Sequence, residues 1–509
     1  MSELLTALGM VFSWDVILVV LGASLFGLFI GAIPGLSATM ATALLVPLTF
    51  FMDPLPAVAS IVAATAMAIV AGDIPGALLR IPGTPASAAY TEEAYQMGQK
   101  GFLGQALGVN LLCSATGGLI GVAVLAGFAP LIAEFALSFT SDEYFWLALL
   151  GLSCAVLVSG GVPLKGALSM LLGLMISMVG MDSVSGQVRF TFGVSELIGG
   201  VSILPVLIGL FAVTEILRRL PEIGRDVIPQ VPEVGNPFRG ACSLMWKYKG
   251  GVVRGGLLGT VIGALPGAGA DIASWVSYAL ARRFSRTPEK FGTGHPEGLV
   301  AASSANNAAL AGAYVPALVF GIPGDTITAI IIGVLMMKGI TPGPDVFTTD
   351  STLVMAIFLV FLLANLLLLP LGLLAVKSTR HLLALPTSVL YPLILLFCIV
   401  GAYAANNSLL DVGLMLVLGL LAYVMTENGF PIGPMILAVI LGPVVESNFM
   451  RSMIKSNGDL SMLFDRPIAA ALGALALLVW GSIILGSVRS ALSQRKNGSG
   501  DGKAGVCSQ

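Results

Sequence analysis

The sequence predicts an all-α integral membrane protein with two inverted-topology repeats that contain broken, re-entrant helices. Three observations carry this prediction. Hydrophobic residues make up 56% of the 509-residue chain and charged residues only 10%, with a mean hydropathy of +0.96, whereas soluble domains carry about 25% charged residues. Long apolar runs follow one another along the whole chain. Four Pro-Gly units interrupt these runs at related places in the two halves.

Seven apolar runs form the first half, residues 1–217, and each is predicted to be helical. About 20 apolar residues span roughly 30 Å of hydrocarbon, where a helix satisfies its own backbone polar groups. The runs do not alternate as barrel strands do. The first basic residue of the chain is Arg80, so the first run lacks the basic region of a signal peptide and is expected to stay in the mature protein. The runs lie near residues 16–33, 36–50, 56–72, 102–138, 143–159, 163–181 and 194–217.

An arginine-containing polar stretch then separates the two halves. Residues 218–249 are predicted to be a cytoplasmic linker and residues 250–450 the second transmembrane repeat. Residues 451–488 would add one C-terminal transmembrane helix, and residues 489–509, rich in Gly, Ser and Lys, a disordered cytoplasmic tail. The later apolar runs lie near residues 250–266, 268–281, 297–320, 325–337, 351–376, 386–404, 408–425, 430–448 and 467–488.

The two halves resemble each other, which indicates an internal duplication. Three motif pairs stand in the same order in both halves, and the separation within a pair grows slowly along the chain, as small loop insertions would cause. We name these separations the first, second and third motif offsets. The first motif offset separates GAIPGLSATMA, which begins at Gly31, from GALPGAGADIA, which begins at Gly263. The second separates PGALLRIPGTPASA, from Pro75, and PALVFGIPGDTITA, from Pro316. The third separates KGALSMLLG, from Lys165, and DVGLMLVLG, from Asp411.

Basic residues predict that the halves are inverted, because cytoplasmic loops carry an excess of Lys and Arg. The loop at 51–56 and the loop at 140–143 have no basic residue, whereas the matching loops of the second half have several. Matching loops would therefore face opposite sides, as in the inverted repeats of transporters. This places the N-terminus in the periplasm and the C-terminus in the cytoplasm.

The four Pro-Gly units are predicted to line a transport site for a small organic anion. Proline frees a backbone carbonyl and glycine permits close approach, and inside a membrane such breaks are tolerated where they line a cavity. A broken helix offers an N-terminus that favours an anion and carbonyls that suit a sodium ion. The predicted substrate-binding residues are Pro34, Gly35, Ser37, Arg80, Pro82, Gly83, Thr84, Ser87, Pro266, Gly267, Pro323 and Gly324.

Hard oxygen ligands follow the breaks and are predicted to hold a coupling ion, Na⁺ or H⁺, with no other cofactor. They are Thr39, Asp271, Asn306, Asp325 and Thr328. Two other interpretations stay open. The Pro-Gly units could be helix kinks packed through small residues, and the two aspartates could cap the helices that follow them.

Arg80 also leaves alternatives open. Its guanidinium could bind a substrate carboxylate through two parallel hydrogen bonds. It could instead pair with Asp73, or lie at the membrane surface. The five cysteines and two histidines show no metal-binding spacing, and the net charge of −2 gives no basic field for nucleic acid.

Several long motifs closely resemble the large membrane subunit (TctA) of tripartite tricarboxylate transporters. They are GAIPGLSATMATALLVPLTF, GDIPGALLRIPGTPASAAYTEEAYQMGQKG, GALPGAGADIASWVSY, FGIPGDTITAIIIGVLMMKGITPGP and ENGFPIGPMILAVILGPVVE. The resemblance covers nearly the whole chain. One departure is Glu92-Glu93, where Asp-Gly is common in the family.

The resemblance implies a transport subunit in the bacterial inner membrane and not an enzyme. Its implied partners are a small membrane subunit of about four helices and a periplasmic binding protein that delivers a small carboxylate such as citrate. Uptake would be driven by an ion gradient, with sodium preferred, and a relation to other hairpin-containing carriers implies an elevator-like movement. No GxxxxGK[ST] loop for ATP occurs in the chain.

Two other functions remain as alternatives. A carrier or channel without a binding protein would share the broken helices. A membrane enzyme acting on a lipid-linked substrate would need clustered acidic or histidine residues at the interface, and the sequence has no such cluster.

Overall fold

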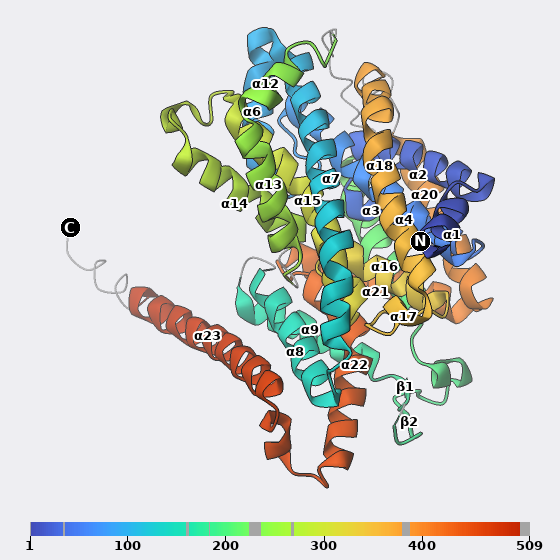
Figure 1. The fold of residues 1–509 in the computed structure, drawn as a ribbon. Coiled ribbons are helices and arrows are strands. Elements are labelled where there is room, and N and C mark those ends of the chain that lie inside the picture. The colour runs from blue at the N-terminus through green and yellow to red at the C-terminus, as the bar shows by residue number, and fades with distance from the viewer. Residues whose placement is uncertain are drawn as a thin grey trace, which may run out of the picture. The chain divides into compact units, whose positions relative to one another are not determined.

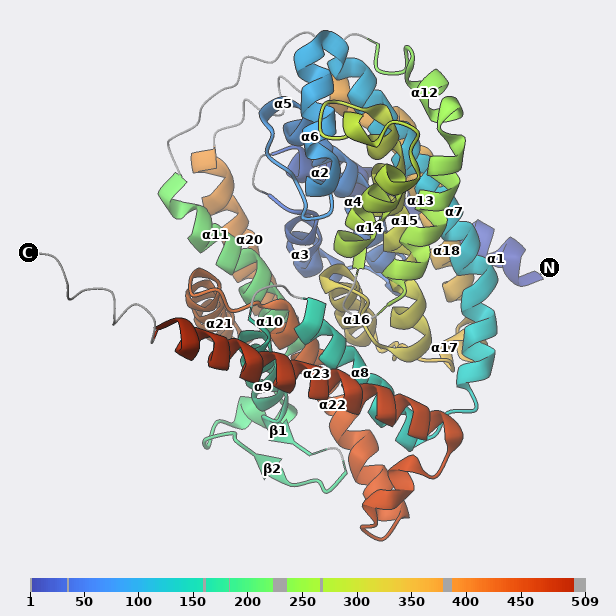
Figure 2. The same cartoon turned by 90° about the vertical axis from the view of Figure 1, so that its left-hand side faces the viewer.

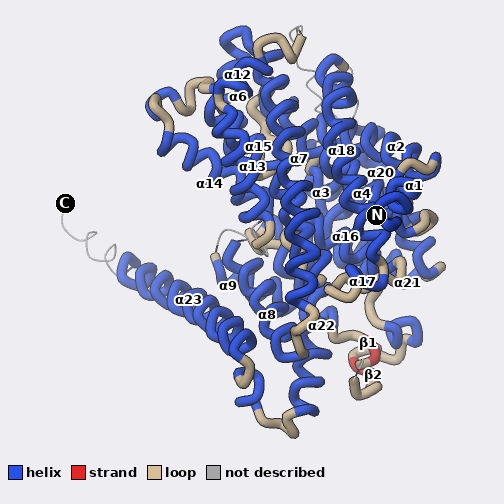
Figure 3. Tube along the Cα trace, viewed as in Figure 1, coloured by secondary structure: helices blue, strands red, loops and turns tan. Residues whose placement is uncertain are grey.

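The computed structural model describes residues 2–33, 36–158, 162–182, 184–222, 236–265, 269–378 and 387–498. Helices dominate this part of the chain (Figures 1 and 3). The chain divides into two compact units, and each unit is built from two separate segments of the chain. Unit 1 comprises Met1–Ser138 and Ser202–Val424, and unit 2 comprises Phe139–Val201 and Met425–Gln509.

Unit 1 contains most of the helices. In the first half they are α1 (Ser2–Val11), α2 (Trp14–Ala32), α3 (Ala38–Thr49), α4 (Pro54–Ala71), α5 (Asp73–Leu79), α6 (Ala88–Met97), α7 (Leu103–Ala136), α10 (Ile203–Leu207) and α11 (Thr214–Arg219). From the linker onwards they are α12 (Ala241–Lys247), α13 (Lys249–Gly263), α14 (Gly269–Phe284), α15 (Pro296–Phe320), α16 (Thr326–Met337), α17 (Val346–Thr349), α18 (Ser351–Lys377), α20 (Thr387–Asn406) and α21 (Leu409–Glu427), whose last residues fall in unit 2.

Unit 2 is smaller. It contains α8 (Ser141–Val158), α9 (Pro163–Ser177), α22 (Gly433–Lys455) and α23 (Pro467–Gly498), with a short antiparallel pair formed by β1 (Gly180–Met181) and β2 (Val188–Arg189). Helix α22 packs against both α8 and α9. Within the unit, Arg189 of β2 forms a two-pronged ion pair with Glu446 of α22, at 2.6 and 3.0 Å.

Six helical stretches in the described chain are long and apolar enough to cross a membrane, which confirms the predicted all-α membrane protein. They are Trp14–Ala32, Pro54–Leu79, Ala88–Ala136, Ser351–Lys377, Leu409–Glu427 and Gly433–Lys455. Five shorter apolar helices accompany them. The protein is therefore a multi-pass membrane protein.

Some elements differ from the sequence prediction. The run at 194–217 is interrupted, because a 3₁₀ turn at Ser195–Gly199 ends at Gly200, whose φ of +87° cannot continue a helix. After it, α10 and α11 are joined by a π-helical segment, Ile208–Val213. The strands β1 and β2, and the helices α1 and α12, were not among the elements predicted from the sequence.

The predicted linker and tail are described only in part. Residues 223–235 of the linker and 499–509 of the tail lie outside the described residues. Helix α12 occupies the end of the predicted linker. Helix α23 extends to Gly498, beyond the predicted start of the tail at residue 489.

Helix α15 forms the centre of unit 1. Every residue from Gly298 to Val319 is buried, and the helix packs against α7, α13 and α14 (Figures 1 and 2). A helix that is apolar or small all round is suited to such a position. Its first turn begins with Pro296, whose missing N–H costs nothing there.

Two helix pairs are packed through the same glycine–alanine contacts. In the pair α2–α4 and in the pair α13–α15, a Cβ added to the glycine would overlap the carbonyl oxygen of the facing alanine. The glycines of the two pairs are related by the first motif offset and the alanines by the second. The contacts are Gly27 with Ala64 and Gly31 with Ala68, then Gly259 with Ala305 and Gly263 with Ala309.

The second Pro-Gly unit of each half also recurs in structure. Gly83 lies against the backbone of Gly72, and Gly324 lies against Ala313. The second motif offset relates Gly83 to Gly324 and also Gly72 to Ala313. The preceding helix ends in each half with a left-handed residue, Arg80 with φ of +60° and Gly321 with φ of +66°. This backbone conformation favours glycine, so the arginine occupies a position that its repeat partner fills at lower cost.

Candidate substrate and ion site

Just after three of the four Pro-Gly units, side-chain oxygens accept hydrogen bonds from backbone amides. The Ser37 hydroxyl accepts a hydrogen bond from the Met40 amide at the start of α3, at 3.2 Å. In the turn that leads into α6, the Thr84 hydroxyl accepts a hydrogen bond from the Ser87 amide and the Ser87 hydroxyl accepts one from the Thr84 amide, both at 3.0 Å. The third case is Asp325, at the start of α16. These contacts satisfy N–H groups that a helix start leaves without partners.

Asp325 and Thr328 form a capping box at the start of α16. The Thr328 amide donates to Asp325 Oδ1 at 2.8 Å, and the Asp325 amide donates to Thr328 Oγ1 at 2.9 Å. The second motif offset relates this pair to Thr84 and Ser87, which form the same reciprocal hydrogen bonds in the turn before α6. The structure therefore shows Asp325 as a helix cap, as one of the two open interpretations predicted, and the cap uses one of its two carboxylate oxygens.

Residues from three different breaks meet at one place, which we name the helix-start cluster and define as Thr39, Gly269, Asp325 and Thr326. The hydroxyls of Thr39 and Thr326 lie 3.4 Å apart. Gly269, the first residue of α14, lies against the side chain of Asp325, because a Cβ built on it would come within 2.8 Å of the aspartate Cβ. The starts of α3, α14 and α16 therefore converge.

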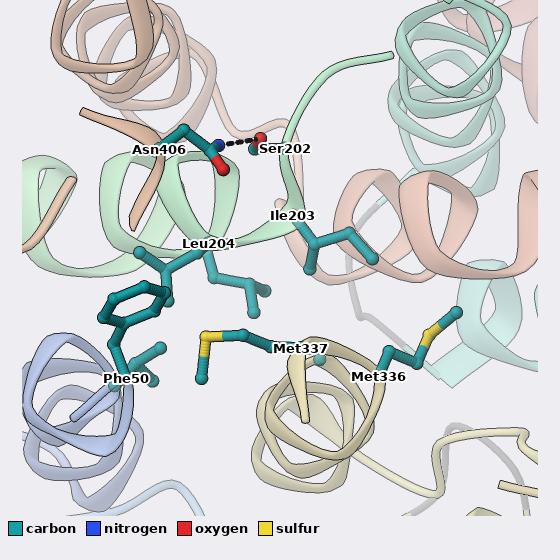
Figure 4. Close-up of a pocket in the computed structure, with 10 residues that line it drawn as sticks. Phe50, Ser202, Ile203, Leu204, Met336, Met337 and Asn406 are labelled. Atoms are coloured by element: carbon teal, nitrogen blue, oxygen red, sulfur yellow. Dashed lines mark hydrogen bonds between the residues drawn. The ribbon is translucent and has the colours of Figure 1, made fainter. Parts of the chain in front are cut away.

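Helices α3 and α16 run in the same direction from this cluster. Their starts meet at Thr39 and Thr326, and their far ends meet again, where Phe50 and Met337 line a common pocket (Figure 4). Each helix start carries a partial positive charge from its aligned peptide dipoles. Several starts aimed at one point make an electrostatic site for an anion, and the hydroxyls there can donate hydrogen bonds to it.

The remaining predicted residues of the breaks are only partly described. Pro34, Gly35, Pro266 and Gly267 lie outside the described residues. Asp271 lies in the first turn of α14, and its side chain is not among those described. In the second unit, Pro82 is exposed while Gly83 is buried, and in the fourth both Pro323 and Gly324 are buried.

Arg80 does not pair with Asp73. Its Nε donates to Glu92 at 2.6 Å, and the arginine side chain is 62% exposed. Asp73 is instead buried and accepts a hydrogen bond from the Tyr90 hydroxyl at 2.8 Å. The structure thus removes the predicted alternative of a structural Asp73–Arg80 pair and leaves most of the arginine side chain uncovered by the protein.

Asn306 takes part in a different network from the helix-start cluster. Its side-chain amide donates to the Tyr90 hydroxyl at 2.9 Å, which connects α15 with α6 and through Tyr90 with Asp73. The neighbouring Asn307 donates to the Ser114 carbonyl at 3.0 Å and to Asn365 at 2.7 Å. These asparagines connect helices of both halves inside unit 1.

Sequence reasoning missed two side chains of α6, Tyr90 and Glu93. The Glu93 carboxylate is fully buried and accepts the backbone amides of Gly292, Gly294 and His295, at 2.5 to 2.7 Å. It fastens the loop between α14 and α15 to α6. No local signal marks it, because Glu93 stands in the polar stretch YTEEAYQ and its partners lie in the second half of the chain.

An apolar pocket of about 350 Å³ lies at the far ends of α3 and α16 (Figure 4). Phe50, Met336 and Met337 line it, and its polar end is formed by Asn406, whose amide donates to the Ser202 hydroxyl at 2.6 Å. Apolar walls replace little of the hydration that a carboxylate loses. This pocket is therefore a poorer anion site than the helix-start cluster. Across the described residues no group of His, Cys, Asp and Glu is arranged to hold a metal.

Comparison with known proteins gives the family. The sequence model of the tripartite tricarboxylate transporter TctA family matches residues 17–437. An Agrobacterium vitis protein, described as an uncharacterized 52.8 kDa protein in the TAR-I ttuC' 3' region, is 36% identical over 471 residues, 92% of each chain. A second from that organism, described as an uncharacterized protein in the TAR-II ttuC' 3' region, is 38% identical over 236 residues, 46% of this chain and 98% of its own.

No solved structure matches the chain. Members of the TctA family are transport proteins that work with a small membrane subunit and a periplasmic binding protein. The chain belongs to the tripartite tricarboxylate transporter TctA family and is a membrane component of a transporter, not an enzyme.

Proposed function

We propose that this chain is the translocating subunit of a binding-protein-dependent importer for a tricarboxylate or a related small carboxylate such as citrate, driven by a sodium gradient across the bacterial inner membrane. The observation that carries the proposal is the convergence of three helix starts at Thr39, Gly269 and Asp325. Their dipoles and hydroxyls suit a carboxylate, and the Asp325 oxygen that the cap does not use suits a cation beside it.

Inverted repeats with an elevator-like movement form part of this proposal. The recurrence of glycine contacts at the motif offsets supports the repeat. Further support comes from unit 1, where Gly419 of α21 packs on Val213 in the π-helical segment, and from unit 2, where Gly173 of α9 packs on Met435 of α22. Gly173 and Gly419 are separated by the third motif offset. The division into two compact units supports a movement of one unit against the other.

The first test concerns the partners. We expect no accumulation of labelled citrate or other tricarboxylates by this chain alone in proteoliposomes with an inward sodium gradient. Accumulation should appear when the small membrane subunit and the substrate-loaded binding protein are added, because the binding protein delivers the substrate. A matched preparation with a potassium gradient is the control. Equal uptake by the isolated chain would instead establish a self-sufficient carrier.

The second test concerns the topology. In the proposed arrangement, the segment around residue 225 is cytoplasmic and the loop at 140–143 is periplasmic, because only the former carries basic residues. Single cysteines are placed at Thr140 and at Arg225 in a chain without its native cysteines. A membrane-impermeant maleimide should label the cysteine at position 140 in intact cells and the cysteine at position 225 only after the inner membrane has been opened. Labelling of both from one side would contradict the inverted repeat.

A further inference from the structure

Basic side chains occur together where α13 begins and α14 ends. The two helices pack against each other (Figures 1 and 2). The guanidinium of Arg254, in the second turn of α13, lies 5.6 Å from the ring centre of Phe284, the last residue of α14. The start of one helix therefore lies beside the end of the other. The basic residues of these two ends are Lys247, Lys249, Arg254, Arg282, Arg283 and Arg286.

These basic residues form no ion pair within the described part of the chain. Several arginines elsewhere do pair with glutamates, as Arg189 does with Glu446. The carboxylates that follow α14 do not supply the missing charge. Glu297 accepts a hydrogen bond from the Ser285 hydroxyl at 2.5 Å, and Glu289 is exposed. The ends of α13 and α14 therefore form a positively charged surface that the described protein does not neutralise.

Arg254 is the one residue of this basic group that is not exposed. Its guanidinium lies against the ring of Phe284. Its Nε is buried and has no hydrogen-bond partner among the described residues, whereas buried polar atoms in proteins almost always have one. A charge at membrane depth is also costly unless something pairs with it. Both observations indicate an anion that approaches Arg254 from outside the protein.

An apolar stripe on the outer face of α13 runs between the two basic residues of this helix. Val253, Leu257 and Val261 are 51%, 47% and 62% exposed, and side chains four residues apart lie on one face of a helix. At about 100° per residue, Lys249 and Arg254 lie on either side of this stripe, about 140° apart. Helix α13 packs beside α7, which is part of a membrane-crossing stretch, so the stripe faces acyl chains.

An exposed tryptophan marks the level of the lipid head groups. Trp246 is 70% exposed, and Lys249 Nζ lies 4.9 Å from the centre of its ring. Tryptophan is enriched where a membrane meets water, because its ring is apolar and its N–H is polar. The two cations of α13 therefore stand where a head group and its acyl chains meet. We name this place the α13 surface and define it by Trp246, Lys249, Arg254 and Phe284.

We propose that the α13 surface binds one anionic phospholipid, with the phosphate at Lys249 and Arg254 and the acyl chains along the apolar stripe. Arginine binds phosphate oxygens through parallel hydrogen bonds, and basic surfaces between membrane helices are suited to anionic head groups. The inference goes beyond the proposed function, since it depends on neither the substrate nor the coupling ion. Helix α14 begins at Gly269 in the helix-start cluster, so the lipid holds the other end of a helix of the candidate transport site.

Native mass spectrometry of the purified full-length protein in detergent tests this site. The protein is titrated with dioleoyl-phosphatidylglycerol, or with dioleoyl-phosphatidylcholine, which has the same chains but no net charge. We expect the unaltered protein to bind the anionic lipid about tenfold or more tightly, which corresponds to about 1.4 kcal/mol. Arg254→Gln should remove most of this preference, because it removes the charge and the fork of N–H donors. Lys249→Gln should lower it by a smaller factor.

Lys377→Gln is the matched control. Lys377 is an exposed cation at the end of α18, another long apolar helix of unit 1, and its removal also takes away one positive charge. The preference for the anionic lipid should stay as in the unaltered protein. Gel filtration of each variant reports folding. If Arg254→Gln does not fold, the comparison of Lys249→Gln with Lys377→Gln decides, since both of these side chains are exposed.

Three results would overturn the proposal. Equal affinity of the unaltered protein for both lipids would show that no site for an anionic head group exists. An equal loss in Lys377→Gln and in the variants of the α13 surface would show diffuse attraction to any cation. Displacement of the bound lipid by inorganic phosphate at equal concentration would show a site for a free anion. A loss confined to Arg254→Gln and Lys249→Gln would support the lipid site, whatever substrate or ion the complete system transports.

Discussion

Gly31→Ala is expected to lower the thermal stability of the protein severely or prevent its folding. An added Cβ would come within 2.7 Å of Ala68 Cα, closer than real Cβ atoms approach, and the atoms it meets are backbone. Overpacking of this kind costs about 1–3 kcal/mol when side chains can adjust. Here α2 would have to move away from α4 along its length, so we expect the upper end of that range or more.

Gly22→Ala is the matched control, because Gly22 lies in the same helix and a Cβ added there would have nothing within 4 Å of it. Alanine there should be neutral or stabilise the helix by up to about 1 kcal/mol, the difference in helix propensity. The measurement is the melting temperature in detergent by intrinsic fluorescence. Gly263→Ala, the repeat-related change, should match Gly31→Ala. Similar melting temperatures for Gly31→Ala and Gly22→Ala would contradict the close packing.

Asp325→Asn is expected to raise the sodium concentration needed for half-maximal uptake by the complete system, with little change in stability. Asparagine caps a helix about as well as aspartate, so the capping box should survive while the charge is lost. The repeat-related pair, Thr84 and Ser87, forms the same reciprocal hydrogen bonds without any carboxylate, in the turn before α6. These hydrogen bonds alone therefore do not require an acidic residue, and the charge of Asp325 needs another explanation.

Asp325→Ala separates the two roles further. It should show the same change in sodium dependence and in addition lose about 0.5–2 kcal/mol of stability with the cap. Uptake measured against sodium, together with melting temperature, distinguishes the variants. An unaltered sodium curve for Asp325→Asn would leave Asp325 as a helix cap only and would remove the cation from the helix-start cluster.

The apolar character and length of the runs were enough to predict the membrane helices, because a bilayer demands them. The contacts between helices were not predicted, although the glycines of GAIPG and GALPG pack against alanines in the same way in both halves. Small residues in apolar helices are typical of close helix–helix contacts, which was one of the two interpretations left open for the Pro-Gly units.

The sequence could not predict which side chains would meet. Arg80 and Asp73 lie close in the sequence and have opposite charges, yet Arg80 pairs with Glu92 and Asp73 with Tyr90. Arg80 adopts a left-handed conformation where α5 ends, and no pattern of residue types announces that conformation at a non-glycine residue. The role of Glu93 depended on a loop far along the chain, in the second half, which local reasoning does not reach.

The burial of α4 has a consequence for synthesis. This helix is almost entirely enclosed, and one of its neighbours, α18, begins only at residue 351. At about 5–20 residues per second, α4 must wait on the order of tens of seconds for that neighbour. The hydroxyls of Ser60 and Thr65 do not need the later helices as partners, because both donate hydrogen bonds to carbonyls of α4 itself, at 2.7 Å. These two hydroxyl protons therefore stay satisfied in lipid while the newly made helix waits.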